Sequence, residues 1–283
     1  MLAKRFPSIL PPLKLEEAME TTVVHSIAGK IPAQQSLLTE RPYRSPHHSI
    51  SATALIGGGS NPQPGEITLA HNGVLFLDEL TEFSKNVLEV MRQPLEDRKV
   101  HISRARYATE FPANFILIAS MNPCPCGYYN HPEKDCTCGS EVVKRYLNKI
   151  SGPLLDRIDL HVEVLPVPFE EIHGLTANES SDKILTRVQK ARDMQTNRFT
   201  QQTFRVNALM DSSMTKKICQ LDLEAERQLK TAMQRFSLSA RAYDRILKVA
   251  RTIADLDQSE CIKTEHLTES IAYRSLDREN WGG

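Results

Sequence analysis

Short apolar runs that end in polar turns characterise roughly the first 166 of the 283 residues. The runs "VLFL" (74–77) and "FILIAS" (115–120) read as buried strands. Between them, the segment "SKNVLEVMRQPLED" carries apolar residues at helical spacing, namely Val87, Leu88, Met91 and Leu95. Strands that alternate with helices predict a three-layer α/β domain with a mainly parallel sheet.

The hydrophobic pattern changes after "LPVPF" (165–169), where strand-like runs stop and helical periods begin. Apolar residues then recur every three or four positions, at Ile184, Val188, Ala191, Leu229, Met233, Phe236, Ile246, Ala250 and Ile253. Ser239 and Thr264 stand where helix N-caps are expected. We therefore predict two domains, an α/β domain at 1–166 and an all-helical domain at 167–283.

Composition narrows the class of protein. The 35 basic and 35 acidic residues balance, so contact with a nucleic acid would need a local basic patch. The longest apolar runs fall far short of the roughly 18 residues of a membrane helix. Pro7, Pro11 and Pro12 break the start of the chain, which we do not interpret as a signal peptide. Six cysteines, four of them bunched at 124–138, do not resemble a secreted disulfide scaffold, and the cytoplasm is the expected compartment.

Two adjacent acids, Asp78 and Glu79, follow the first predicted strand. Such a pair suits nucleotide hydrolysis, since one carboxylate can hold Mg²⁺ and the other can orient or deprotonate water. An ordinary polar turn is an equally good interpretation of "LFLDEL" alone. Asn122 follows the second predicted strand and would place an amide at a neighbouring strand tip, although Asn-Pro by itself is only a turn signal.

Three longer segments carry a resemblance: "GEITLAHNGVLFLDEL", "VLEVMRQPLEDRKVHISRARYATEFPANFILIASMNPCPCG" and "ISGPLLDRIDLHVEV". They resemble AAA+ ATPases of the magnesium-chelatase-like ComM/YifB group, and the similarity covers nearly the whole chain. The resemblance implies a P-loop NTPase type of core with a helical lid, the cofactors ATP and Mg²⁺, and a homo-oligomeric ring, a hexamer when full length.

The same resemblance implies roles for individual residues. Asp78 and Glu79 would be the Walker B acids, Asn122 the sensor-1 residue, and Arg157 an arginine finger reaching a neighbouring subunit's ATP. Arg241 would be the sensor-2 arginine, acting on its own or a neighbour's nucleotide. From the residues alone, Arg157 reads as a structural ion pair with Asp156 or Asp159, and Arg241 as an ordinary exposed helix arginine.

One motif of the family is absent from the sequence: the phosphate-binding loop GxxxxGKS or GxxxxGKT. The only Gly-Lys pair, at Gly29, is followed by Ile31 and has Val24 where the first glycine should be. The "GGGS" stretch has no lysine after it. In the family "MLAKR" directly follows this loop, so we expect a chain that lacks the loop, the first core strand and an amino-terminal domain, and that hydrolyses little ATP alone.

Two inserts, around 50–70 and 98–112, correspond to pore-facing elements of the family. "VHISRARYATEF" alternates on either side of Arg104 and Arg106, which predicts a hairpin with both arginines near its tip. These arginines would track a DNA phosphate backbone. A solvated loop tip is the default from composition alone.

The segment "CPCGYYNHPEKDCTC" contains two Cys-x-Cys pairs separated by nine residues: Cys124 and Cys126, then Cys136 and Cys138. Four thiolates suffice for a closed tetrahedral Zn²⁺ site. Reduced surface thiols or a redox-sensitive pair are the alternatives, and His131 could serve as a ligand only if one cysteine does not. Cys219 and Cys261 read as buried small apolar residues.

Three functions are consistent with these features. The first is an ATP-driven, ring-forming DNA motor that resembles ComM, which the family links to branch migration of recombining DNA during transformation. The second is an ATPase subunit of the magnesium chelatase type. The third is a noncatalytic scaffold that joins an AAA+ ring. The hairpin arginines and the cysteines favour the first.

Overall fold

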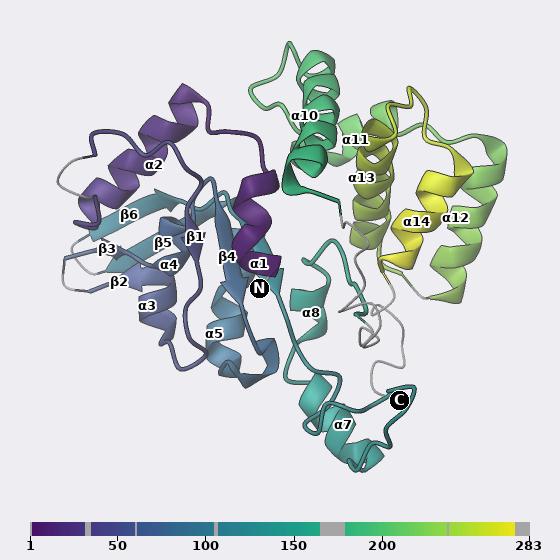
Figure 1. The fold of residues 1–283 in the computed structure, drawn as a ribbon, viewed down its shortest axis with the longest axis horizontal. Coiled ribbons are helices and arrows are strands. Elements are labelled where there is room, and N and C mark those ends of the chain that lie inside the picture. The colour runs from purple at the N-terminus through teal and green to yellow at the C-terminus, as the bar shows by residue number, and fades with distance from the viewer. Residues whose placement is uncertain are drawn as a thin grey trace. The chain divides into compact units, whose positions relative to one another are not determined.

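The computed structural model describes residues 2–31, 35–59, 61–104, 107–164, 179–236 and 238–274. The chain forms two compact units, Met1–Arg157 and Ile158–Trp281, which are coloured purple to teal and teal to yellow in Figure 1. The predicted boundary between residues 166 and 167 lies outside the described residues.

The first unit contains a three-stranded parallel sheet in the order β1 (Tyr43–Arg44), β4 (Val74–Leu77), β7 (Ile116–Ala119). Both apolar runs form strands, and the predicted parallel sheet is confirmed. Only β4 is buried as predicted: Ile116 and Ala119 of β7 are exposed and Leu117 and Ile118 are half-buried, because β7 lies at the edge of this sheet. Strand β4 lies in the centre, where Val74, Leu75 and Leu77 are fully buried. Leu77 pairs with Ala119, so β4 and β7 end level with each other.

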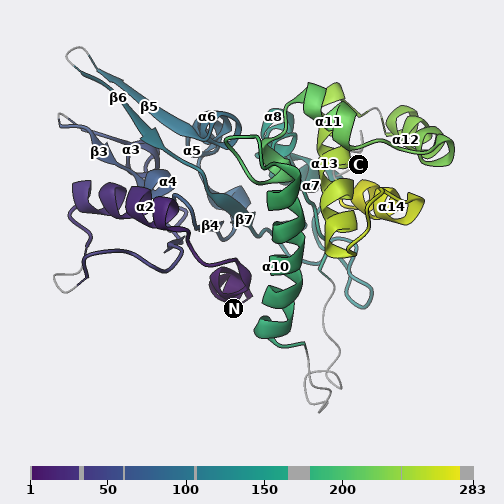
Figure 2. The same ribbon diagram turned by 90° about the horizontal axis from the view of Figure 1, so that it is seen from above.

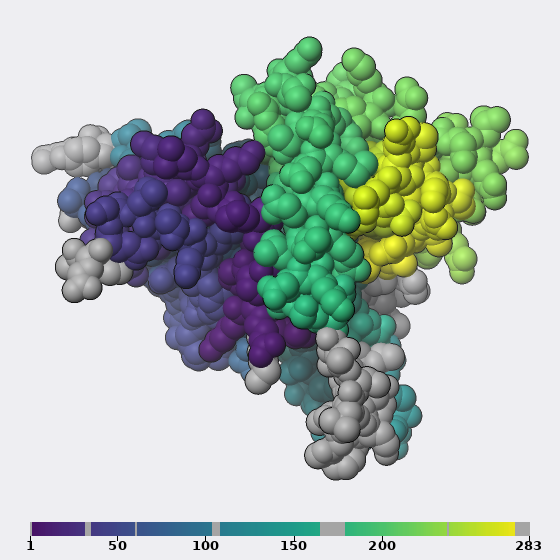
Figure 3. Space-filling view, turned by 45° about the horizontal axis from the view of Figure 1, so that its top comes forward, coloured from purple at the N-terminus to yellow at the C-terminus, as the bar shows by residue number. Residues whose placement is uncertain are grey.

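The first unit also contains helices, several of which contribute buried residues to the core around the sheet. They are α1 (Leu2–Arg5), α2 (Leu15–Ile27), α3 (Ala52–Ile56), α4 (Glu66–Leu69), α5 (Lys85–Val90), α6 (Arg92–Asp97), α7 (Ser140–Leu147) and α8 (Gly152–Leu155), with 3₁₀ turns η1 (Phe6–Ile9) and η2 (Leu80–Glu82). The purple amino-terminal part of the chain lies at the surface in Figure 3. Helix α2 buries Ala18, Thr21 and Val24 on one side and exposes the other side to solvent. The exposed side is apolar, with Leu15, Met19, Val23 and Ile27 each at least half exposed.

The segment predicted as one helical face is two helices that meet at Met91. Pro94 has no N–H to donate to the carbonyl of Val90, which breaks the helical hydrogen-bond ladder there. The apolar face survives the break, because Val87, Leu88 and Met91 are all buried in the core.

Two antiparallel hairpins extend from the first unit. One is formed by β5 (Lys99–Arg104) and β6 (Tyr107–Pro112), as predicted, and the other by β2 (Gly57–Gly58) and β3 (Gln63–Pro64). Figures 1 and 2 both show the two hairpins side by side. Gly57 has φ +109°, and a Cβ there would lie 2.4 Å from the backbone oxygen of Gln63 in the same hairpin, so the β2–β3 turn requires glycine at this position.

The second unit is helical, as predicted: α10 (Ser181–Arg198), η3 (Asn207–Leu209), α11 (Ser212–Ile218), α12 (Leu223–Arg235), α13 (Ala240–Leu256) and α14 (Thr264–Ala272). Its core includes the buried residues Phe199, Leu229, Ile246, Leu247 and Leu267. Ser239 caps α13 as predicted, since its Oγ accepts from Ala242 N. Thr264 is instead the first residue of α14, after Lys263 as N-cap. Within the described ranges, every helix is too short or too polar to cross a membrane.

Candidate functional site

The parallel pairing of β4 and β7 brings Asp78 and Ser120 together at one edge of the sheet. Each is the first residue after its strand, and Ser120 Oγ donates a hydrogen bond to Asp78 Oδ1. Two backbone hydrogen bonds continue the pairing of β4 and β7 past the strand ends. Ser120 N donates to Leu77 O at 3.0 Å, and Leu80 N donates to Ser120 O at 2.8 Å. The exposed carboxylate of Asp78 is thereby held at the carboxyl edge of the sheet.

Glu79 has left-handed backbone angles, φ 54° and ψ 52°, which are rare for a residue other than glycine. Its amide donates to Asp78 Oδ1 at 3.2 Å. Its side chain is 57% exposed, and Oε2 lies 3.3 Å from His48 Nδ1. The His48 ring in turn packs edge-on against Phe83, with 6.4 Å between ring centroids. Strained backbone at an exposed acid is typical of a functional site.

Asn122 is exposed three residues beyond the end of β7, directly after the partly buried Met121. It follows the carboxyl end of β7, the strand that pairs with the strand leading to Asp78 and Glu79. Carboxylate, hydroxyl and amide oxygens are the hard donors that Mg²⁺ prefers. The donor set at this edge fits that ion.

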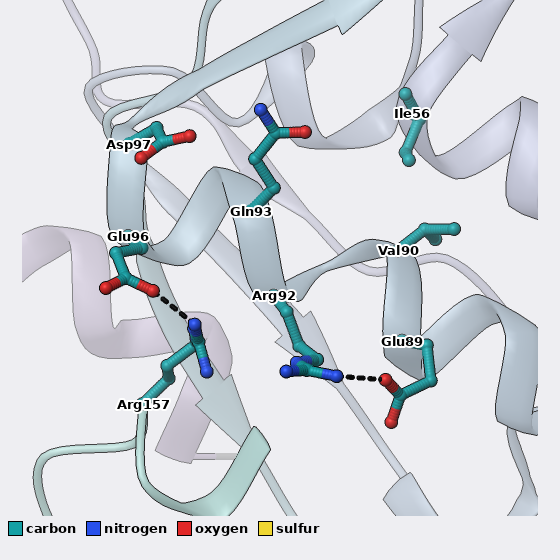
Figure 4. Close-up of a pocket in the computed structure, with 8 residues that line it drawn as sticks. All are labelled: Ile56, Glu89, Val90, Arg92, Gln93, Glu96, Asp97 and Arg157. Carbon is teal, nitrogen blue, oxygen red and sulfur yellow. Dashed lines mark hydrogen bonds and ion pairs between the residues drawn. The ribbon is translucent and has the colours of Figure 1, made fainter. Parts of the chain in front are cut away.

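Arg157 follows α8 and lies against α6, as Figure 4 shows. Its Nη2 forms an ion pair with Glu96, and its Nη1 donates to Pro153 O at 2.7 Å. Its side chain is only 11% exposed. The structure thus pairs this arginine with Glu96, a residue that the sequence did not single out.

A pocket of 430 Å³ surrounds this arginine, lined by Ile56, Glu89, Val90, Arg92, Gln93, Glu96, Asp97 and Arg157. On its other side Glu89 accepts from Ser151 Oγ and from Arg92 Nη1, both at 2.6 Å. The bond from Ser151, followed by that from Arg92, lowers the pKa of Glu89. Two ion pairs, Arg157 with Glu96 and Arg92 with Glu89, therefore line the pocket.

The other arginines singled out by the sequence lie elsewhere. Arg241 is exposed in the first turn of α13, in the helical unit. Arg104 ends β5, and its side chain is outside the described residues, as is Arg106. The hairpin that carries them is anchored at its base by the buried side chains of Val100, Ile102 and Phe111.

The four clustered cysteines converge on one point between β7 and α7. The Cys124 and Cys126 sulfurs are 3.3 Å apart, those of Cys124 and Cys136 3.7 Å, and those of Cys126 and Cys136 3.5 Å. With Cys138, all four sulfurs lie within 4.8 Å of one another. His131 is not in this group; its Nδ1 accepts from the Glu133 and Lys134 amides, both at 3.1 Å.

These thiols differ in acidity. A backbone hydrogen bond at Tyr128 is the main reason that the pKa of Cys126 is lowered to about 5. For Cys136 a backbone hydrogen bond at Cys138 favours the thiolate, but desolvation and the Cys126 and Cys124 sulfurs outweigh it and raise the pKa to about 12. Outside the cluster, burial raises the pKa of Cys219 to about 11, whereas Cys261 is exposed and not buried as predicted.

Three residues of these sites escaped the sequence reasoning: Ser120, His48 and Glu96. Ser120 could have been found, since it occupies in "FILIAS" the position that Asp78 occupies after "VLFL". His48 and Glu96 meet their partners only through tertiary packing, and no local pattern indicated them.

Comparison with known proteins places these features in a family. The family model described as magnesium chelatase, subunit ChlI, matches residues 1–172, and that described as magnesium chelatase, subunit ChlI C-terminal, matches residues 178–274. Together the two models cover most of both units.

Relatives of similar sequence are found in several bacteria. An uncharacterized protein of Escherichia coli, YifB, is 46% identical over 279 residues, which are 98% of this chain and 54% of YifB. The competence protein ComM of Haemophilus influenzae is 42% identical over 283 residues, 98% of this chain and 53% of ComM. The uncharacterized protein Rv2897c of Mycobacterium tuberculosis is 38% identical over 282 residues, 97% of this chain and 54% of that protein. The chain spans about half the length of the curated relatives it matches.

Proposed function

We propose, from the premise that this chain belongs to the magnesium chelatase ChlI family, that it is part of an ATP-driven, ring-forming DNA motor of the ComM kind. The observation that carries the proposal is the pair Asp78 and Glu79 at the edge of a parallel sheet whose neighbouring strand leads to Asn122. A competence protein among the relatives supports a role on DNA taken up by cells.

In this proposal the residues at the sheet edge divide the work of hydrolysis. Asp78, held by Ser120, offers carboxylate oxygen to Mg²⁺, which would neutralise charge on the phosphates of ATP. Glu79 accepts a proton from the attacking water or orients it, and Asn122 hydrogen-bonds that water or the γ-phosphate. Phosphate binding itself needs a GxxxxGKS or GxxxxGKT loop, which this sequence does not contain.

Arginines complete the proposed site across a homo-oligomeric ring, which we take to be a hexamer. Arg157 stabilises charge on the phosphoryl group of a neighbouring subunit's ATP, after exchanging Glu96 for that phosphate. Arg241 acts as the sensor-2 arginine, on its own or a neighbouring subunit's nucleotide. The domains are proposed as 1–166 and 167–283.

DNA contact is assigned to the two adjacent hairpins. Arg104 and Arg106 are placed by sequence at the turn of the β5–β6 hairpin, and the β2–β3 hairpin lies beside it. We propose that the two arginines track the DNA phosphate backbone within the ring.

Zn²⁺ at the four cysteines is proposed as a structural cofactor. The cytoplasm is proposed as the compartment.

The proposal is tested by ATP turnover with and without branched DNA. The polypeptide would be compared with an extended version that carries a GxxxxGKS loop ahead of Met1. The 283-residue chain should hydrolyse little ATP, and the extended version should hydrolyse ATP faster when branched DNA is added. Hydrolysis at ordinary rates by the original chain, or no response of the extended one to DNA, would contradict the proposal.

Two alternatives follow from specific observations. The description of the matching family model favours a chelatase ATPase that drives Mg²⁺ insertion into a porphyrin, and stimulation by a porphyrin-handling partner instead of DNA would support it. The helical unit and Arg157, through which the chain could dock on intact subunits, suggest a noncatalytic scaffold, which would join rings of such subunits without binding ATP.

A further inference from the structure

The segment from Ser120 to Gly139 links β7 to α7 without a helix or strand of its own. Among its residues only Cys124 is buried, so it has almost no apolar core. Structureless loops longer than about 12–15 residues are uncommon in compact domains and need another source of order. The cysteine sulfurs lie at the centre of the segment and are its most evident organising feature.

The spacing of these sulfurs matches the geometry of a bound metal. With Zn–S bonds of about 2.3 Å, the sulfurs of a tetrahedral site lie about 3.8 Å apart. Three of the pairs are 3.3, 3.5 and 3.7 Å apart. These separations are much longer than the roughly 2.05 Å of a disulfide. Four soft sulfur donors select Zn²⁺ over Mg²⁺.

The backbone of the first cysteine pair is shaped to present both sulfurs to one point. Gly127 N donates to Cys124 O at 3.0 Å, which closes a tight turn over "CPCG". Gly127 has φ +81°, a conformation that favours glycine. The turn reverses the chain directly after Cys126, so that the second pair can approach the first.

We infer that Cys124, Cys126, Cys136 and Cys138 form a closed structural Zn²⁺ site, and that this site fixes the position of Asn122. Four protein ligands fill a tetrahedral shell and leave no open position, so the metal serves structure and not catalysis. Asn122 is separated from the first ligand only by Pro123, and α7 begins two residues after the last one. The metal therefore ties the end of β7 to the start of α7. The part concerning Asn122 rests on its proposed role as sensor.

Metal analysis of the full 283-residue chain, purified without added zinc, tests the site itself. We expect about one equivalent of zinc per chain. Cys126→Ser and Cys138→Ser should each lose most of it, whereas the matched controls Cys261→Ser and His131→Ala should retain it. Less than roughly a tenth of an equivalent in a folded chain, or full retention in both cysteine variants, would overturn the site.

A second measurement serves if the variants fail to fold. The wild-type chain reconstituted with Co²⁺ should show the strong thiolate-to-metal absorption of a tetrahedral four-sulfur site. Alkylation of the denatured, unreduced protein should modify all six cysteines. Recovery of a disulfide within the cluster would overturn the inference in favour of a redox pair.

Hydrogen exchange before and after chelation tests the link to Asn122. Zinc removal should speed amide exchange around residues 120–139 and leave α2 unchanged. Unchanged exchange near Asn122 in the metal-free chain would overturn the positioning role. None of these measurements requires ATP hydrolysis. Failure of the proposed DNA motor would therefore leave the results on the zinc site interpretable.

Discussion

His48 Nδ1 lies 3.3 Å from Oε2 of Glu79, the carboxylate proposed to prepare the attacking water. The contact joins the loop after β1 to the end of β4, and the same loop leads into α3 and the β2–β3 hairpin. The edge-on contact with the buried Phe83 restricts the orientation of the His48 ring. A side chain that orients the base would influence hydrolysis without touching the nucleotide.

Replacing His48 should therefore reduce ATP turnover in the extended polypeptide that carries a GxxxxGKS loop. We expect a reduction of about 10-fold for His48→Ala, against about 100-fold or more for Glu79→Gln, which removes the base itself. His131→Ala is the control, because His131 Nδ1 accepts from the Glu133 and Lys134 amides and not from a group at Glu79. Equal effects of the two histidine substitutions on kcat would contradict the role of His48.

Mixing of variant subunits tests whether Arg157 acts across a subunit boundary. Arg157→Ala and Glu79→Gln should each abolish most turnover in the extended protein, since an arginine finger contributes about 10³-fold or more. A mixture of the two should recover activity, because some interfaces then pair an intact acid with an intact arginine. No recovery in the mixture, with both variants still assembling, would leave Arg157 as the partner of Glu96 and nothing more.

The fold was more predictable from sequence than the site, and the reason lies in the range of the interactions. The strand end before Asp78, the strand within "FILIAS", the hairpin around Arg104 and the cap at Ser239 follow from local patterns and are present in the structure. The ion pair of Arg157 with Glu96 joins residues 61 positions apart, so nothing local marks it. The helix break at Met91 has a local cause, the missing N–H of Pro94, but the apolar spacing continues across it and predicts one continuous helical face.

The salt dependence of DNA binding tests the hairpin arginines. Replacing both Arg104 and Arg106 with alanine should weaken binding and lower the slope of log K against log [salt] by about 0.9 for each DNA phosphate that the variant no longer neutralises. Lys99→Ala is the matched control, since Lys99 lies at the base of the same hairpin and is paired with Glu110 at 2.6 Å. An unchanged slope in the double variant, with the control also unchanged, would remove the assignment.

The stability of the helical unit depends on a buried carboxylate. Asp255 is fully buried and accepts from Arg198 Nη1 at 2.8 Å, Asn207 Nδ2 at 2.7 Å and Arg251 Nε at 3.1 Å. Asp255→Asn would leave two arginine charges without their counterion, at a cost of about 3–5 kcal/mol in the free energy of unfolding. Denaturant unfolding measures this cost. Asp257→Asn, at an exposed ion pair, should cost under about 1 kcal/mol, and equal costs would contradict the argument.

The buried His71 should make the first unit sensitive to acid. Its Nδ1 accepts from Asn114 N at 3.1 Å, so the neutral ring carries its proton on Nε2, which faces Glu20 at 3.3 Å. A protonated Nδ1 could no longer accept this hydrogen bond, and its own N–H would face the N–H of Asn114. Burial lowers the pKa of His71 below its ordinary value of 6.5, against the opposing effect of Glu20.

The sign of the pH dependence follows from this lowered pKa. Below pH 6.5 the unfolded chain binds the proton more readily than the folded one, so stability is full above pH 6.5 and declines as the pH falls through and below it. The free energy of unfolding should therefore fall between about pH 6.5 and 5. His71→Asn, whose Oδ1 can still accept from Asn114, should flatten this decline, whereas His101→Asn on the exposed hairpin should not. Burial also lowers the pKa of His25, so part of the decline should remain in the variant. Identical pH slopes for the wild-type chain and His71→Asn would show that His71 is not responsible.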